Sequence, residues 1–251
     1  MKLQLAFLAG VIAISNASPH PTSVKGRHFD EPGNPDQPDQ PYGCNCTGTT
    51  PGPLPSSAQY ICYDWRLGPK TLPKYLPLSS ELSSYDRFDG LTPGEFIKTW
   101  WDPELNPPYG SFRYPGDVTP GDQGFSIDIN GKPISGFVEL PPNTYLDRFG
   151  KETGMFLSSA DTPYSQRSLP PSNLNNRPDD PGFPNDYHVY RTTQKLILNA
   201  GPIAPWFGQP GLGTQFYSGP RTIADLIGNK TLERVDPSVL ISNRQQQGCG
   251  Y

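Results

Sequence analysis

The stretch Ala204-Pro-Trp-Phe-Gly-Gln-Pro-Gly-Leu-Gly-Thr-Gln-Phe216 holds three aromatic residues, three glycines, two prolines and two glutamines in thirteen positions. Gly208 and Gly213 have the spacing of a phosphate-binding P-loop, but Thr214-Gln215 stands where such a loop requires Lys followed by Ser or Thr. Without that lysine nothing reaches the terminal phosphates, so hydrolysis of a nucleoside triphosphate is excluded. Pro210-Gly211 and Gly213 instead predict a tight turn, with Trp206 and Phe207 packing it in place.

The composition predicts a folded domain preceded by a disordered segment. The 251 residues include 32 Pro and 26 Gly, a proportion that approaches that of low-complexity chains. The 12 Phe, 13 Tyr and 4 Trp indicate a hydrophobic core, because disordered chains contain few aromatic residues. The net charge of −4 and the absence of a Lys/Arg run argue against nucleic acid or an anionic membrane surface as a partner.

The N-terminus has the features of a secretory signal peptide. Lys2 precedes an apolar run over residues 3–14, and a small-residue cleavage pattern ends at Ala17, so residues 1–17 are the expected signal. Residues 18–56 show no apolar periodicity and are predicted to be a Pro-rich disordered segment or a propeptide. No second apolar stretch is long enough to span a bilayer. We therefore expect a secreted protein, extracellular or at the cell surface.

Four cysteines in an exported chain predict two disulfides. A bond between Cys44 and Cys46 would be strained because one residue separates them, which leaves two pairings. Both pairings tie Cys249 to Cys44 or Cys46 and join Cys62 to the other of these two. Two sequons predict N-glycans, at Asn45 and Asn229.

Helix signals concentrate in residues 57–112, which we predict to be a helical lead-in. Thr92-Pro-Gly-Glu95 combines an N-cap residue, a proline at the first helical position and a Glu three residues after the cap. This pattern predicts a helix from Pro93 to about Trp101. Short helices are also expected within residues 77–85 and 223–227.

Strand patterns dominate residues 113–235. Phe125-Ser-Ile-Asp-Ile129 alternates apolar and polar residues, and the following Asn130-Gly131 predicts a hairpin with a return strand over 134–140. Residues 187–198 are a further strand candidate. The expected fold is α+β and β-rich, a compact domain over 113–235 built on a mostly antiparallel sheet. Residues 236–251 are expected to form a C-terminal tail anchored by Cys249.

Metal and serine-hydrolase chemistry have little support in the sequence. The histidines are His20, His28 and His188, and with the thiols in disulfides a zinc site has almost no ligands left. His188 has no accompanying Gly-x-Ser-x-Gly elbow. Asp179-Asp180 lacks the loop pattern of a calcium site, so a structural Ca²⁺ is unsupported. We expect no metal site and no required cofactor.

Two arginines beside turn residues, Arg148 and Arg167, are candidate ligands of a phosphate group, which a guanidinium can hold through two parallel hydrogen bonds. The alternative is structural. Both arginines could equally pair with Asp147 or with backbone carbonyls, and the sequence leaves the two interpretations open.

Five blocks of sequence occur in a characteristic order. They are Leu146-Asp-Arg-Phe-Gly150, Gly154-Met-Phe-Leu157, Gln166-Arg-Ser-Leu-Pro-Pro-Ser-Asn-Leu174, Tyr187-His-Val-Tyr190 and Gly201-Pro-Ile-Ala-Pro-Trp-Phe-Gly-Gln-Pro-Gly-Leu-Gly-Thr-Gln215. Over about residues 113–235 the chain resembles the tuberculosis necrotizing toxin (TNT) domain and, more closely, the secreted fungal NAD glycohydrolases that carry it.

The resemblance implies cleavage of the nicotinamide–ribose bond of NAD⁺ or NADP⁺, which yields nicotinamide and ADP-ribose. It implies that Gln215 is the residue most closely tied to catalysis and that His188 is a second catalytic residue. On this basis the glycine-rich turn would deliver Gln215 to the reacting ribose. Four residues match the substrate-binding set of the family: Arg148, Phe149, Phe156 and Arg167.

Two other functions remain open at this point. An ADP-ribosyltransferase would share the first step and pass the sugar to a protein. A non-catalytic secreted glycoprotein could bind carbohydrate through its Tyr and Trp residues, although a neutral glycan site would need neither the two arginines nor Gln215. The sequence also leaves open a homodimer and an immunity partner.

Overall fold

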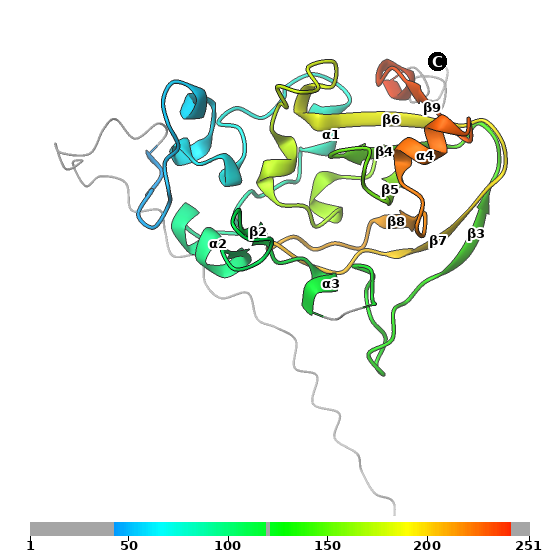
Figure 1. The fold of residues 1–251 in the computed structure, drawn as a ribbon, viewed down its shortest axis with the longest axis horizontal. Helices are drawn as coiled ribbons and strands as arrows, with labels where there is room; N and C mark the ends of the chain where they lie inside the picture. Colours follow the sequence, from blue (N-terminus) through cyan, green and yellow to red (C-terminus); the bar gives the residue numbers. More distant parts are fainter. Residues whose placement is uncertain (1–42, 119–120, 242–251) are drawn as a thin grey trace, which may run out of the picture. The chain divides into compact units, whose positions relative to one another are not determined.

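The computed structural model describes residues 43–118 and 121–241 (Figure 1). The expected signal peptide, most of the Pro-rich segment and Cys249 lie outside these residues. Within the described ranges, no helix combines the length and the apolar character needed to cross a membrane.

A seven-stranded sheet forms the centre of the fold and confirms the predicted β-rich α+β class. Its strands lie in the order β3-β7-β8-β5-β4-β6-β9, and each pair of neighbours is antiparallel. The bounds are β3 (Gly136–Leu140), β4 (Tyr145–Phe149), β5 (Phe156–Ser159), β6 (Tyr187–Thr192), β7 (Leu196–Pro202), β8 (Thr214–Tyr217) and β9 (Leu232–Val235).

The two faces of the sheet have different characters because successive side chains of a strand point to opposite sides. On one face Leu146, Leu157 and Phe216 form a hydrophobic core with helix α4 (Ile223–Gly228), which Figure 1 shows in orange beside β9. The strand register places Asp147 and Gln215 on the opposite face. Polar side chains in the centre of this second face mark it as the face that carries a site.

The segment before the sheet contains short helices, as predicted. These are α1 (Leu78–Glu81), α2 (Pro93–Trp100) and α3 (Pro115–Val118), with a two-stranded sheet of β1 (Trp101–Asp102) and β2 (Ser111–Phe112). The capping pattern of α2 is confirmed: Thr92 Oγ1 accepts from the Glu95 amide at 3.3 Å, and the Glu95 carboxylate accepts from the Thr92 amide at 2.8 Å. The described residues also form short 3₁₀ helices: Ser56–Gln59, Ile61–Tyr63, Trp65–Leu67, Tyr164–Gln166, Pro171–Leu174 and Pro184–Asp186.

Two strand predictions were wrong in their connections. Residues 187–198 form parts of two strands, β6 and β7, which are separated in the sheet by β4, β5 and β8. At the predicted hairpin, Asn130-Gly131 does form a turn, but only the isolated bridge between Ile127 and Pro133 joins its arms. Backbone bonds of 2.7 Å flank Pro133, from the Ile134 amide to Ser126 and from the Asp128 amide to Lys132. Beyond them strand β3 pairs with β7 and not with residues 125–129.

The stretch 204–216 forms a tight turn followed by strand β8. Phe207 and Gly208 both have positive φ angles, 53° and 70°, while Trp206 and Gln209 exchange their two backbone hydrogen bonds across them. Gly211 is required by space as well as by its φ of +65°, since a Cβ there would lie 2.7 Å from the carbonyl oxygen of Ile203. A tight turn is therefore present, but it lies at Phe207-Gly208 and not, as predicted, at Pro210-Gly211 and Gly213.

An aromatic cluster attaches this turn to the N-terminal segment. Phe207 is buried and its ring lies 5.4–6.4 Å from four others, those of Phe96, Trp100, Phe112 and Tyr114. Gln209 is buried beside it, and its Nε2 donates to the backbone oxygen of Asp86 at 2.5 Å. Gln209, the first glutamine of the stretch, therefore has a structural role.

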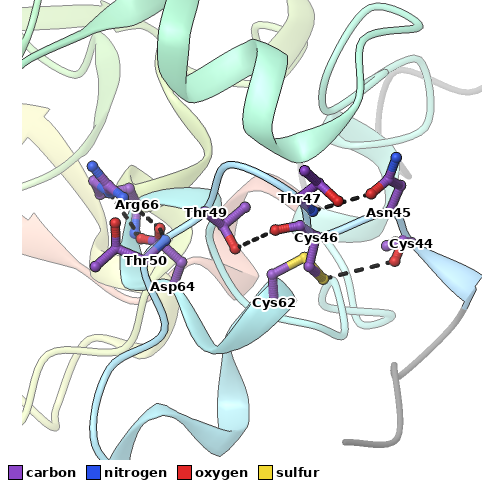
Figure 2. The surroundings of a disulfide bond; sticks show 9 residues. All are labelled: Cys44, Asn45, Cys46, Thr47, Thr49, Thr50, Cys62, Asp64 and Arg66. Carbon is purple, nitrogen blue, oxygen red and sulfur yellow. Dashed lines mark hydrogen bonds and ion pairs between the residues drawn. A yellow bond between two sulfur atoms is a disulfide. The ribbon is translucent and has the colours of Figure 1, made fainter. Parts of the chain in front are cut away.

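One disulfide is present among the described residues, between Cys46 and Cys62 (Figure 2). Near it, the amide of Thr50 donates to Asp64, whose carboxylate also binds Arg66. Residues 43–56, which the sequence assigns to a disordered segment, are therefore joined covalently and by hydrogen bonds to the lead-in. The predicted end of the disordered segment at residue 56 therefore needs correction. Residues 43–56 show no apolar periodicity, but the disulfide joins them to the lead-in.

The Cys46–Cys62 bond selects one of the two predicted pairings and leaves Cys44 for Cys249. Peptide mapping of the unreduced protein should find one peptide pair linked through Cys46 and Cys62 and another linked through Cys44 and Cys249. The chain must be fragmented at Asn45 so that the partners of Cys44 and Cys46 can be told apart. A peptide that joins Cys44 to Cys62 would contradict this pairing.

Candidate active site

A cleft of about 520 Å³ opens on the face of the sheet opposite α4. Residues of the sheet form one wall, and part of the facing wall is formed by Tyr114, Pro115, Gly116, Gly121, Gln123 and Gly124. A narrower extension of about 40 Å³ continues from it to Asp147 and Ser158. Five of the predicted site residues line the cleft: Arg148, Phe149, Phe156, Arg167 and Gln215.

Gln215 is held at the centre of this cleft by β8. It lies opposite Ser158 of β5 and Gly201 of β7 in the strand register, so its side chain leaves the middle of the sheet. Its Nε2 donates to the backbone oxygen of Gln123 in the facing wall at 2.8 Å. This bond directs the amide across the cleft and leaves Oε1 as an acceptor, since no described residue is seen to donate to it.

Two phenylalanines give the cleft an apolar surface. Phe156 is half-buried and stacks on Tyr217, with 5.1 Å between the ring centroids. Phe149 is fully buried and packs against the rings of Tyr164 and Tyr187. Phe156 therefore presents a ring to a ligand, whereas Phe149 forms the floor.

Arg148 reaches the cleft around the end of strand β4. Its Nε donates to the carbonyl oxygen of Lys151 at 2.9 Å and its Nη1 to that of Phe156 at 2.7 Å. A Cβ at Gly154 would lie 2.0 Å from Nη2, so this position must be glycine for the guanidinium to lie where it does. The guanidinium thus has backbone partners, as the structural interpretation predicts, and also faces the cleft.

Arg167 does not have the geometry of a phosphate ligand. It is buried, and each nitrogen of its guanidinium donates to the protein: Nε to Thr162, Nη1 to Asp147, and Nη2 to Asp147 and Glu81. The two bonds to Asp147 measure 2.5 and 2.7 Å. Arg167 lines the cleft, but two buried carboxylates already hold its charge, so direct binding of substrate by Arg167 stays a prediction.

Glu81 is a member of this group that the sequence analysis missed. It ends helix α1, is buried, and accepts from Tyr187 Oη at 2.8 Å and from Arg167 Nη2 at 3.2 Å. Burial and the nearby charge of Asp147 raise the pKa of Glu81 to about 7, against the opposing effect of Arg167. No motif surrounds Glu81 in the sequence, so only its place in the fold identifies it.

His188 lies on the other face of the sheet from Gln215. The register pairs it with Arg148, and it is buried with Nε2 3.2 Å from Asp186 Oδ1 and its ring stacked on Phe183. Its Nδ1 is 3.8 Å from Glu152 Oε1. His188 is not among the residues that line the cleft, so the expectation of a catalytic role by contact with substrate does not fit this placement.

Metal ligation has no candidate group here. Over residues 43–118 and 121–241, no cluster of three or more His, Cys, Asp or Glu side chains is arranged to hold an ion. Asp179, considered for calcium, forms an ion pair with Arg177 at 2.5 Å.

The cleft also contains residues that carried no signal in the sequence. Tyr114, Gln123 and Gly124 lie before the blocks that suggested a family, yet they form the wall opposite Gln215. Gln123 contributes its backbone oxygen, and a backbone contact places little restriction on residue type.

Comparison with known proteins identifies the family of the chain. The family model described as tuberculosis necrotizing toxin matches residues 139–235. Over 179 residues, 71% of this chain and 72% of the relative, the chain is 45% identical to the conidial surface nicotinamide adenine dinucleotide glycohydrolase nadA of Aspergillus fumigatus.

Solved structures give weaker similarities. The tuberculosis necrotizing toxin complexed with its immunity factor IFT aligns with a TM-score of 0.35 and 20% identity, over 50% of this chain and 64% of the toxin chain, so this chain spans slightly less than two thirds of that structure. Tse6 in complex with Tsi6 aligns with a TM-score of 0.29 and 19% identity, over 41% and 72%. Similarities of this size carry no weight for function. The chain is 45% identical to the glycohydrolase over more than two thirds of both proteins, and it matches the family model. This chain therefore belongs to the tuberculosis necrotizing toxin family.

Proposed function

We propose that the cleft hydrolyses the nicotinamide–ribose bond of NAD⁺, and also that of NADP⁺. The observation that carries this proposal is the convergence of Gln215, Phe156 and Arg148 on one cleft, in a chain that is 45% identical to an NAD glycohydrolase. The volume of about 520 Å³ lies in the range of small-molecule sites.

The reaction makes few demands on proton transfer. The bond between the anomeric carbon and the pyridinium nitrogen breaks, and its electron pair neutralises the ring, so nicotinamide leaves without a general acid. Water adds to the anomeric carbon and loses one proton to solvent, which gives ADP-ribose. The barrier lies in the oxocarbenium-like ribose, and a site lowers it by holding the sugar and the water in place.

Gln215 is suited to this positioning role. Its Nε2 is engaged with Gln123, so Oε1 can accept from a ribose hydroxyl or from the attacking water. A glutamine cannot act as a base at neutral pH, and here it does not need to. Orientation of the reacting groups is the contribution that we assign to it.

Phe156 and Arg148 are suited to binding. The face of Phe156 attracts the cationic nicotinamide ring, and this attraction weakens as the ring becomes neutral, so it assists binding more than the chemical step. Arg148 supplies a positive charge at the same cleft for the pyrophosphate. In this proposal Arg167 acts through Asp147 and Phe149 and does not touch the substrate.

Replacing Gln215 should abolish most hydrolysis without loss of the fold. We expect Gln215→Ala to lower kcat by about 100-fold, since misplaced reacting groups cost on this order. Release of nicotinamide from NAD⁺ measures the loss. Gln194→Ala, an exposed glutamine at the turn between β6 and β7, is the matched control. Turnover of Gln215→Ala close to that of the wild type would refute the role, and label transferred from NAD⁺ to protein would favour an ADP-ribosyltransferase.

The two arginines should respond differently to replacement by alanine. Arg148→Ala should raise KM for NAD⁺ by about tenfold or more, because it removes a charged hydrogen-bond donor from the cleft. Arg167→Ala should lower the free energy of unfolding by about 3 kcal/mol or more, since it leaves two buried carboxylates without their partner. Steady-state kinetics and urea unfolding measure these effects. Arg191→Ala, which removes a half-buried arginine remote from the cleft lining, is the control. Equal effects of both replacements on KM, with unchanged stability, would contradict this division.

We further propose that the protein is exported and glycosylated. The side chains of Asn45 and Asn229 are exposed, and each uses its Oδ1 in a local hydrogen bond while Nδ2, the atom that carries a glycan, has no described partner. Peptide N-glycosidase should reduce the apparent mass of the protein secreted by a eukaryotic host. Removal of both sequons should abolish that shift, and secreted protein that is already free of glycan would contradict the proposal.

A further inference from the structure

The buried group beneath the cleft contains more acceptors than donors. Glu81 and Asp147 are two carboxylates, and Arg167 is the one cation that contacts both. Tyr187 Oη lies 2.8 Å from Glu81 Oε1 and 3.0 Å from Asp147 Oδ2. A phenol has one proton, so it can donate to only one of these two oxygens.

A second proton, in addition to that of the Tyr187 hydroxyl, would supply the missing hydrogen-bond donor. If Glu81 carries it, Glu81 donates to the Tyr187 oxygen and Tyr187 donates to Asp147, so every short contact becomes a hydrogen bond. The same proton reduces the charge of the group from −1 to zero, which burial favours.

We propose that Glu81, from the helical lead-in, is a positioning residue of the cleft that shares one proton with Asp147 through the Tyr187 hydroxyl. The part of this inference that concerns activity rests on the proposed function. Glu81 lies outside the region matched by the family model, residues 139–235, and nothing in the sequence pattern assigns it a role.

The geometry places the shared proton on Glu81. Asp147 receives both bonds of the Arg167 fork, at 2.5 and 2.7 Å, whereas Glu81 receives a single bond of 3.2 Å. The charged and titratable groups that face Glu81 are Asp147 from β4, Tyr187 from β6, Arg167, and Asp161 from the turn after β5. The two acids among these groups favour the neutral form of Glu81, and the raised pKa described above agrees with this assignment.

The cluster connects to the cleft through Arg167. The guanidinium carbon lies 5.1 Å from the ring centre of Phe149, and both residues line the cleft, while Asp147 lines its narrow extension. Loss of the shared proton would leave two buried carboxylates in repulsion and one short contact without a hydrogen. Arg167 and the floor of the cleft would then lose their fixed position.

The first test measures stability and needs no substrate. Because the pKa of Glu81 is raised from 4.5 to about 7, the folded state binds one proton more than the unfolded state between these values. The urea midpoint of the wild type should therefore fall relative to that of Glu81→Gln as pH rises from 5 to 8. Glu139→Gln, which alters an exposed ion pair with Lys195, is the control. Parallel pH dependences of the wild type and Glu81→Gln would overturn the shared proton.

The second test measures kcat/KM for NAD⁺ between pH 6 and 8. The neutral fraction of a group with a pKa of about 7 falls from about 90% to about 10% over this range, so the wild-type value should fall by up to about tenfold. Glu81→Gln keeps the neutral network, and its profile, scaled to its own value at pH 6, should lack this fall. Glu81→Ala should be less active than Glu81→Gln at each pH.

A Glu81→Gln profile that falls like the wild type would overturn the positioning role. A wild-type protein that does not hydrolyse NAD⁺ at any pH would contradict the proposed function instead. The stability comparison would then still decide whether the proton is shared.

Discussion

The buried ion pair between Arg167 and Asp147 is the interaction on which the site depends. It joins the turn after β5 to the centre of β4, and through Tyr187 and Glu81 it also holds β6 and the lead-in. A buried pair of this kind adds little net stability compared with apolar packing, but it accepts few alternative arrangements. We infer that this ion pair fixes the floor of the cleft, and that the desolvation of two buried carboxylates opposes the stability it provides.

The alternation of side chains along the strands then divides the polar residues into two groups. Asp147 and Gln215 lie on the cleft face, whereas His188 lies with Tyr190 and Glu152 behind the sheet. A one-residue shift in register would exchange these groups, so the sheet itself decides which side chains can meet a substrate. Arg148 belongs to the rear face by register and reaches the cleft only because β4 ends one residue later.

The choice of Gln215 over Gln209 came from the family resemblance and stays a prediction. Local signals allowed the capped helix at Pro93 and the presence of a tight turn within 204–216 to be predicted from the sequence. These features depend on nearby residues, whose pattern the chain displays directly. The split of 187–198 into two distant strands could not be predicted, because both halves have the same strand-like character and only long-range pairing separates them. Glu81 was missed for a similar reason: its hydrogen-bond partners lie 86 and 106 positions away along the chain.

Six residues that line the cleft lie upstream of the region that the family model matches: Tyr114, Pro115, Gly116, Gly121, Gln123 and Gly124. The chemistry and the shape of the entrance are therefore encoded in separate parts of the chain. Exchanges among these upstream residues would change the lining of the cleft and leave Gln215 unchanged. Relatives that share all five sequence blocks could thus have diverged in substrate choice, and a comparison of their catalytic segments alone would not reveal it.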